Sequence, residues 1–366
     1  MITISGTLSK GWMHRALGVA FDHDYYFDPV KRHSVDCLCN QYAAETFPDL
    51  ALFCSESNLG RIQYWAPDQV QVGGIQPNML LGMLLGAEFR PCEDRDADIT
   101  PGCLANVEPS ELPAVETLVE HDLVRLFDRQ IAQIRHESRG RLCAIPPFFW
   151  DASGRAAIHG VLTTAQKLCG EIVFIDMIAE PHKCRQIMQW IADAYALLCR
   201  HFARTADLPI AEIHVGECSS CMVGAALVRE FVVPATSEIA RELGPVRFHS
   251  CGDSTRLLEA FAGIERLCSV DVGGETSLRR AREVFGHEMP ISIAPLPCNM
   301  SAESTAPILG WAGRVLAENA GGPLDFVCHI EPDYNIETIR ALTDFLGQRD
   351  DFRSLEPYHR GNGRRI

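Results

Sequence analysis

His249 and Cys251 form a His-x-Cys pair near the end of a short apolar run, and both side chains are of types that bind zinc. The run Pro245-Val-Arg-Phe-His-Ser-Cys-Gly-Asp253 has the composition of a buried strand, in which residues two apart point to the same face. An imidazole and a thiolate would therefore be directed at one point. With 13 His and 15 Cys in 366 residues, this spacing also arises readily by chance, so spacing alone does not establish a site.

The second half of the chain alternates between short apolar runs and longer helical patterns, which is typical of a parallel sheet or barrel. Predicted strands are Ile210–Val215, Val246–His249, Leu267–Val270, Ile291–Ala294 and Leu324–Cys328. Predicted helices occupy 222–243, 254–263, 277–286, 302–319 and 335–347. The carboxyl ends of barrel strands form one rim, where active sites are built. Polar or metal-binding residues stand at these strand ends, and we expect them to converge there: Glu217, His249, Cys251, Asp271, Asn299 and Cys328.

The segment Phe-His-Ser-Cys-Gly-Asp, followed by Cys328 in Leu-Asp-Phe-Val-Cys-His, resembles a known zinc signature. It is the His-x-Cys and distant Cys signature of the cobamide-dependent coenzyme M methyltransferases, members of the uroporphyrinogen decarboxylase superfamily. The resemblance covers about residues 140–350. It implies a (β/α)8 TIM barrel and Zn²⁺ bound by His249, Cys251 and Cys328. It also implies that a thiol substrate takes a methyl group from a corrinoid carried by a partner protein.

A zinc ion with three protein ligands keeps its fourth position exchangeable, and a thiol bound there loses its proton to become a nucleophile. The resemblance implies that Asp271 occupies this position until substrate arrives, with Glu275 as the alternative. It further implies that Glu217 hydrogen-bonds ligand or substrate, and that Asn299 matches a Gly-Asn of the superfamily. Cys218-x-x-Cys221 has no counterpart there, and its role is open between core cysteines and an extra thiol site.

Three other functions fit parts of the pattern. A demethylase component would move a methyl group from a small-molecule donor onto Co(I) of the corrinoid protein, with zinc as a Lewis acid. A porphyrinogen decarboxylase would use the same barrel without metal, but its Arg-Gln-Ala-Gly-Arg motif is absent. A binding or scaffold protein would retain zinc without catalysis. A metal analysis followed by methylation assays separates these alternatives.

Length and composition predict one α/β domain spanning 1–366. We expect 1–45 to form short capping helices, Asp49–Cys54 to be the first barrel strand, and 68–112 to be an insertion or a set of short elements. The net charge of −15 argues against nucleic acid and anionic membranes as partners, because both reward surplus Lys and Arg. The sequence has no export signal or membrane-length apolar run, so we expect a cytoplasmic enzyme whose cysteines remain thiols.

Overall fold

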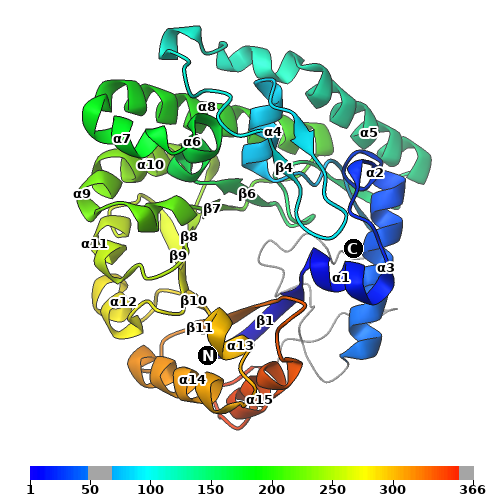
Figure 1. Cartoon of the computed structure of the whole chain (residues 1–366). Helices are drawn as coiled ribbons and strands as arrows, with labels where there is room; N and C mark the ends of the chain where they lie inside the picture. The colour runs from blue at the N-terminus through cyan, green and yellow to red at the C-terminus, as the bar shows by residue number, and fades with distance from the viewer. Residues whose placement is uncertain (48–67, 354–366) are drawn as a thin grey trace.

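Seven parallel strands form one sheet in the order β1-β11-β10-β9-β8-β7-β6. In the computed structural model, which describes residues 1–47 and 68–353, this sheet curls around the centre of the molecule with helices outside it (Figure 1). The strands are β1 (Ile2–Leu8), β6 (Arg155–His159), β7 (Glu212–Gly216), β8 (Val246–Ser250), β9 (Leu267–Gly273), β10 (Ile291–Ala294) and β11 (Leu324–Ile330). The predicted α/β, TIM-barrel-like fold is confirmed.

Two smaller pairs of strands accompany the main sheet. β2 (Gln69–Gln71) pairs with β5 (Cys143–Ile145) in parallel, and β3 (Phe89–Arg90) pairs with β4 (Asp98–Ile99) in antiparallel. Together with α4 (Pro77–Leu84) and the 3₁₀ helix η1 (Pro109–Glu111), β2, β3 and β4 make up the stretch 68–112. The predicted strand Asp49–Cys54 lies outside the described residues.

The helices follow the strands in the alternation that the sequence predicts. Pro181 stands in the first turn of α8, where the missing amide hydrogen of proline costs nothing. The helices from the middle of the chain onward are α5 (Asp122–Ser138), α6 (Val161–Cys169), α7 (Ile172–Ala179), α8 (Pro181–Ala206), α9 (Ala225–Leu227), α10 (Val233–Leu243), α11 (Leu258–Phe261), α12 (Leu278–Phe285), α13 (Pro297–Met300), α14 (Ala306–Asn319) and α15 (Ile336–Gly347). Short helical turns are η2 (Val115–Glu120), η3 (Cys218–Met222), the π-helical η4 (Val228–Val232) and η5 (Thr255–Leu257).

The N-terminal segment differs from the predicted helical cap, because its first residues form a strand of the main sheet. β1 pairs in parallel with β11 along its whole length, and Figure 1 shows the two side by side. Thr3 and Ser5 donate side-chain hydrogen bonds to Asp325 of β11, whereas Ile2 and Ile4 are buried in the hydrophobic core. Only the residues that follow are helical, in α1 (Lys10–Leu17), α2 (His23–Phe27) and α3 (Pro29–Thr46).

One row of residues crosses the whole sheet in register and brings polar side chains into the barrel interior. From β6 to β1 the row consists of His159, Gly216, His249, Asp271, Ser292, Asp325 and Thr3. Polar groups in a barrel interior must hydrogen-bond to one another, because water is largely excluded there. This row therefore positions the site. Among the described helices, none combines the length and the apolar character that crossing a membrane requires.

Candidate metal centre

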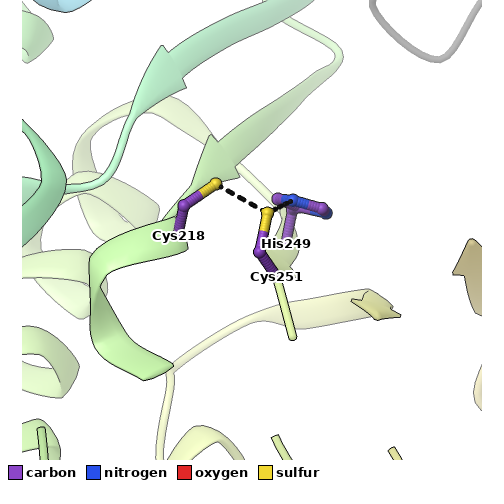
Figure 2. Close-up of side chains that lie close together, drawn as sticks. All are labelled: Cys218, His249 and Cys251. Carbon is purple, nitrogen blue, oxygen red and sulfur yellow. Dashed lines mark hydrogen bonds between the residues drawn. The ribbon is translucent and has the colours of Figure 1, made fainter. Parts of the chain in front are cut away.

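Three metal-binding side chains converge at the carboxyl ends of β7 and β8. Nε2 of His249 lies 3.0 Å from Sγ of Cys251, and Sγ of Cys251 lies 3.0 Å from Sγ of Cys218 (Figure 2). The donor atoms of the three residues all lie within 4.8 Å of one another. Figure 2 shows Cys218 reaching the pair from a separate helical turn, which is η3. Within the described residues this is the one group of three or more His, Cys, Asp or Glu side chains close enough to share a metal ion.

The imidazole of His249 is held from behind by Asp271. Its Nδ1 lies 3.0 Å from Oδ2 of Asp271, which leaves Nε2 directed at Cys251. Asp271 in turn accepts a hydrogen bond from Arg247 at 3.0 Å, and the same guanidinium nitrogen donates to Ser292 at 3.1 Å. A carboxylate on the far nitrogen of a ligating histidine fixes the ring orientation and makes the imidazole a stronger ligand.

These contacts control the charges of the three side chains. Burial disfavours a charged His249, but the charge and hydrogen bond of Asp271, together with Cys251, outweigh it and raise the pKa of His249 to about 10. Hydrogen bonds from Cys218 and His249 lower the pKa of Cys251 to about 5 and outweigh burial. Despite burial, Arg247 and His249 hold the pKa of Asp271 well below its usual range. The contacts thus favour the ionised form of Cys251 and the protonated form of His249.

The turn that carries Cys218 is fixed by buried hydrogen bonds. Glu217, fully buried, accepts hydrogen bonds from the backbone N–H groups of Leu162 and Thr163 at the start of α6 and from the Thr163 hydroxyl. The Thr163 hydroxyl oxygen accepts a further one from the backbone of Ser219. Burial raises the pKa of Glu217 to about 7, although these hydrogen bonds oppose the rise. Glu217 is thus a positioning residue for Cys218 and does not line the pocket.

A chain of hydroxyl groups ties this turn to β8. Ser250 lies 3.1 Å from Ser220 and 2.9 Å from Ser254, oxygen to oxygen, and all three side chains are buried. After Cys251 the chain turns at Gly252, whose φ of +65° favours glycine. These contacts hold Cys218 and Cys251 at the same rim position.

A pocket of about 310 Å³ opens beside the three-residue cluster. Its wall includes His249 and Asp271 together with further imidazoles and one indole: His159, His214, His329 and Trp150. The ring of His214 lies against Trp150, with their centroids 4.8 Å apart, and its centroid is 5.9 Å from that of His249. Of the cluster, His249 lines this pocket, whereas Cys218 and Cys251 are not part of its wall.

Cys328 is not part of the cluster. It shares a face of β11 with Phe326, which packs edge-on against Trp311 of α14, whereas the next residue, His329, lines the pocket. Because successive strand residues point to opposite faces, Cys328 is directed to the helix layer. The described structure thus gathers Cys218 with His249 and Cys251, in the place where the sequence pattern expects Cys328.

Of Asp271, Asn299 and Glu275, which the sequence also predicts at the site, the structure places Asp271 in direct contact with a member of the cluster. Asp271 contacts His249 from the side away from Cys251, which is the position of a supporting carboxylate. Asn299, in α13, is buried and does not line the pocket. Glu275 is exposed and also lies outside the pocket wall. The thiol of Cys221 donates a hydrogen bond to the backbone carbonyl of Cys218 at 3.0 Å, which closes the turn.

Sequence reasoning missed Arg247, His214 and His159. A signal was present, because Arg247 and His249 alternate along β8 in phase with Cys251 just after it, and His214 precedes Gly216 by two positions on β7. A period of two places each set on one strand face. Recognising that this face is the barrel interior requires the register between strands.

Comparisons with known proteins give the fold and little more. No family model matches the chain, and no curated protein matches it. Among solved structures, the chain is similar to a methyltransferase from Methanosarcina mazei, with a TM-score of 0.61 and 14% sequence identity. The match covers 93% of this chain and 90% of that one. At this identity, the likeness shows a shared fold over nearly the full length of both proteins.

Proposed function

We propose that this protein is a zinc-dependent methyltransferase that moves a methyl group between a corrinoid on a partner protein and a small-molecule thiol. The observation that carries the proposal is the group of Cys218, His249 and Cys251 at the strand ends, with His249 also lining a pocket inside the barrel. The same fold in a methyltransferase of Methanosarcina mazei supports it.

The donor set fits a catalytic zinc ion. Two cysteine sulfurs and one histidine nitrogen, all within 4.8 Å of one another, match the Cys₂His sets that leave a fourth position for substrate. When bound, zinc would lower the pKa of a substrate thiol, so that the sulfur is a nucleophile at neutral pH. Soft sulfur ligands favour zinc over Mg²⁺ or Ca²⁺, which prefer oxygen.

The residues of the chain prepare the site in three ways. Asp271 orients His249, and Arg247 holds Asp271. The pKa of Cys251 is lowered, which eases its ionisation, and a cation must displace the protons of its ligands, so its affinity rises with pH. The buried hydroxyl chain from Ser220 to Ser254 keeps η3 close to β8.

The overall reaction balances without a further reactant. A sulfur lone pair forms the new S–CH₃ bond while the C–Co bond breaks heterolytically, leaving both electrons on cobalt and converting methyl-Co(III) into Co(I). The thiol proton goes to solvent. In the opposite direction, which is the alternative function, a methylated donor transfers its methyl group to Co(I).

The test uses the full-length protein loaded with zinc and methylcobalamin as the methyl donor. With a panel of small thiols, we expect the methyl-Co(III) absorption to be lost and a methyl thioether to appear in equal amount. Cys251→Ala should abolish both signals and lower the zinc content. If the zinc-loaded protein binds no thiol, and the cobalt spectrum changes with neither thiols nor methylated donors, the proposed function is wrong.

A further inference from the structure

Cys218 and Cys251 are placed so that their sulfurs can bond to each other. Their Sγ atoms lie 3.0 Å apart, and Figure 2 shows the two side chains pointing toward one another from separate segments of the chain. A disulfide needs a sulfur–sulfur distance of about 2.05 Å, so the gap that remains is about 1 Å. A gap of this size is within the range of side-chain rotation.

The two backbones run at the spacing that a disulfide requires. Gly216 of β7 pairs with His249 of β8, and each cysteine follows its strand residue by two positions. Neighbouring strands lie roughly 4.8 Å apart, which is within the range of about 4.4–6.8 Å between the Cα atoms of disulfide-bonded cysteines. Just before the pair, the backbone N–H of Glu217 donates to the carbonyl of His249 at 2.8 Å. The strand spacing thus persists up to the cysteines.

Contacts beyond the pair hold both segments in place. Arg256, in η5, donates from its guanidinium to the backbone carbonyls of Cys221 and Val223 at the end of η3. The hydroxyls of Ser220 and Ser250 bridge the same two segments, and both side chains are buried. These contacts keep the two cysteines at a fixed separation, so the pair needs no rearrangement of the backbone to react.

The third cysteine of this region, Cys221, is directed elsewhere. Its thiol is hydrogen-bonded to the carbonyl of Cys218, and it does not belong to the group of mutually close donor atoms. Cys251 is exposed, whereas Cys218 is half-buried. A reagent from solvent therefore reaches Cys251 first, and the sulfur next to it is that of Cys218.

We propose that Cys218 and Cys251 form a reversible disulfide when the protein carries no zinc, by exchange with a small-molecule disulfide. In the first exchange, the sulfur of Cys251 bonds to one sulfur of the reagent, and the other half of the reagent leaves as a thiol. In the second exchange, the sulfur of Cys218 attacks that of Cys251 and releases the remaining half as a thiol. The two cysteine protons end on the two released thiols, so the protein loses two electrons and the reagent gains them.

The disulfide and zinc exclude each other, because both use the same two sulfurs. The bridge would leave His249 as the one free donor of the three, whereas a zinc ion on the cluster would engage both sulfurs. Metal loading thereby depends on the redox state of the thiols around the protein. The inference goes beyond the proposed function, since it requires competition with zinc but no methyl transfer.

The test uses the reduced full-length protein, with and without zinc, and oxidised glutathione as the reagent. Without zinc, we expect peptide mapping by mass spectrometry to find Cys218 linked to Cys251. With free zinc at about 100 times its dissociation constant, only about 1% of the sites are free, so the bridge should form about 100-fold more slowly. No bridge, a bridge to Cys221 instead, or an equal rate at every zinc concentration would overturn the inference.

Three single variants separate the roles of the sulfurs. Cys251→Ser should form no bridge, and Cys218→Ser should stop at a mixed disulfide of glutathione with Cys251, because the second sulfur is missing. Cys221→Ser, from the same turn, is the matched control and should form the bridge at the wild-type rate. Thermal unfolding of the reduced proteins checks the fold, and the wild-type mapping tests the inference even where a variant does not fold. Loss of the bridge from folded Cys221→Ser would contradict the assignment.

The two proposals fail in different ways. A bridge that zinc prevents, in a protein that is inactive with methylcobalamin, would refute only the proposed function. Methyl transfer by the zinc-loaded protein, with no bridge in its metal-free form, would refute only this inference.

Discussion

Asp271 and His249 form an ion pair in which Oδ2 lies 3.0 Å from Nδ1, on the side of the imidazole opposite Cys251. The two ring nitrogens therefore have separate partners, the carboxylate of Asp271 on one side and the sulfur of Cys251 on the other. Since Nδ1 is paired with Asp271 and Nε2 faces Cys251, Nε2 is the nitrogen that can bind a cation beside the two cysteines. Asp271 would act on a bound metal through His249, whereas the sequence pattern predicts a direct ligand.

This arrangement predicts the effect of Asp271→Asn. The amide cannot stabilise an imidazolium or fix its orientation as a carboxylate does, so we expect zinc affinity to fall about 10- to 100-fold. Asp325→Asn is the control, because Asp325 lies in the same row but is hydrogen-bonded by Thr3 and Ser5. Affinity is measured by competition with a chromophoric chelator, and thermal unfolding checks the fold. Equal affinities of the folded variants would contradict a supporting role.

The third metal ligand is tested by comparing cysteine variants. We expect Cys218→Ala and Cys251→Ala to lose most of their zinc in metal analysis of the purified proteins, because each removes one of three ligands. Cys328→Ala should retain zinc, since its side chain faces the helix layer. Cys221→Ala, three residues along the same turn, controls for damage to η3. Zinc loss from Cys328→Ala with retention in Cys218→Ala would restore the ligand set expected from sequence.

Gly160 provides a test of how the turn of Cys218 is positioned. A Cβ at Gly160 would overlap the carboxylate of Glu217, which must then move away from the start of α6. We expect Gly160→Ala to lower the free energy of unfolding by about 1–3 kcal/mol, as overpacking does, and to weaken zinc binding by displacing η3. Gly347→Ala, whose Cβ meets nothing within 4 Å, serves as control. Denaturant unfolding and zinc titration of both variants are the measurements. Wild-type stability and zinc affinity in Gly160→Ala would show that Glu217 does not position this turn.

His159 predicts a loss of stability in acid. Its folded pKa of about 4 lies below the ordinary value of 6.5, so between these pH values the unfolded chain binds a proton that the folded chain does not. The unfolding free energy should therefore fall as pH decreases from about 6.5 to about 4, by at most about 3 kcal/mol from this residue. The measurement is the difference between wild type and His159→Gln across this range. A difference that is independent of pH would contradict a buried, neutral His159.

The alternation of strands and helices in the second half of the chain was predictable because each element has its own period of apolar residues. The His249 and Cys251 pair was predictable for the same reason, since both residues belong to one strand. The position of Cys218 was not, because η3 is placed by the buried Glu217 and by hydroxyl contacts to Ser250 from a different element. No periodicity in the sequence encodes such contacts.

Two other differences have equally simple origins. Cys328 is one residue out of phase with the interior face of β11, and a shift of one residue moves a side chain to the opposite face of a sheet. Ile2–Leu8 alternates apolar residues with Thr3, Ser5 and Thr7, which is a strand pattern, but its partner strand lies at the other end of the chain. Sequence patterns show that a segment can pair, whereas the partner is determined by the order of strands in the curled sheet.

The pairing of β1 with β11 also affects how the protein folds during synthesis. Thr3 and Asp325, which are hydrogen-bonded in the native state, are 322 positions apart, so the ribosome delivers the first strand long before its partner. Closing so long a loop carries a large entropic cost, and contacts of this kind slow folding. Until β11 emerges, β1 is an unpaired edge exposed to other nascent chains, which is a risk for aggregation. We expect the newly made chain to depend on chaperones until its last strand has been translated.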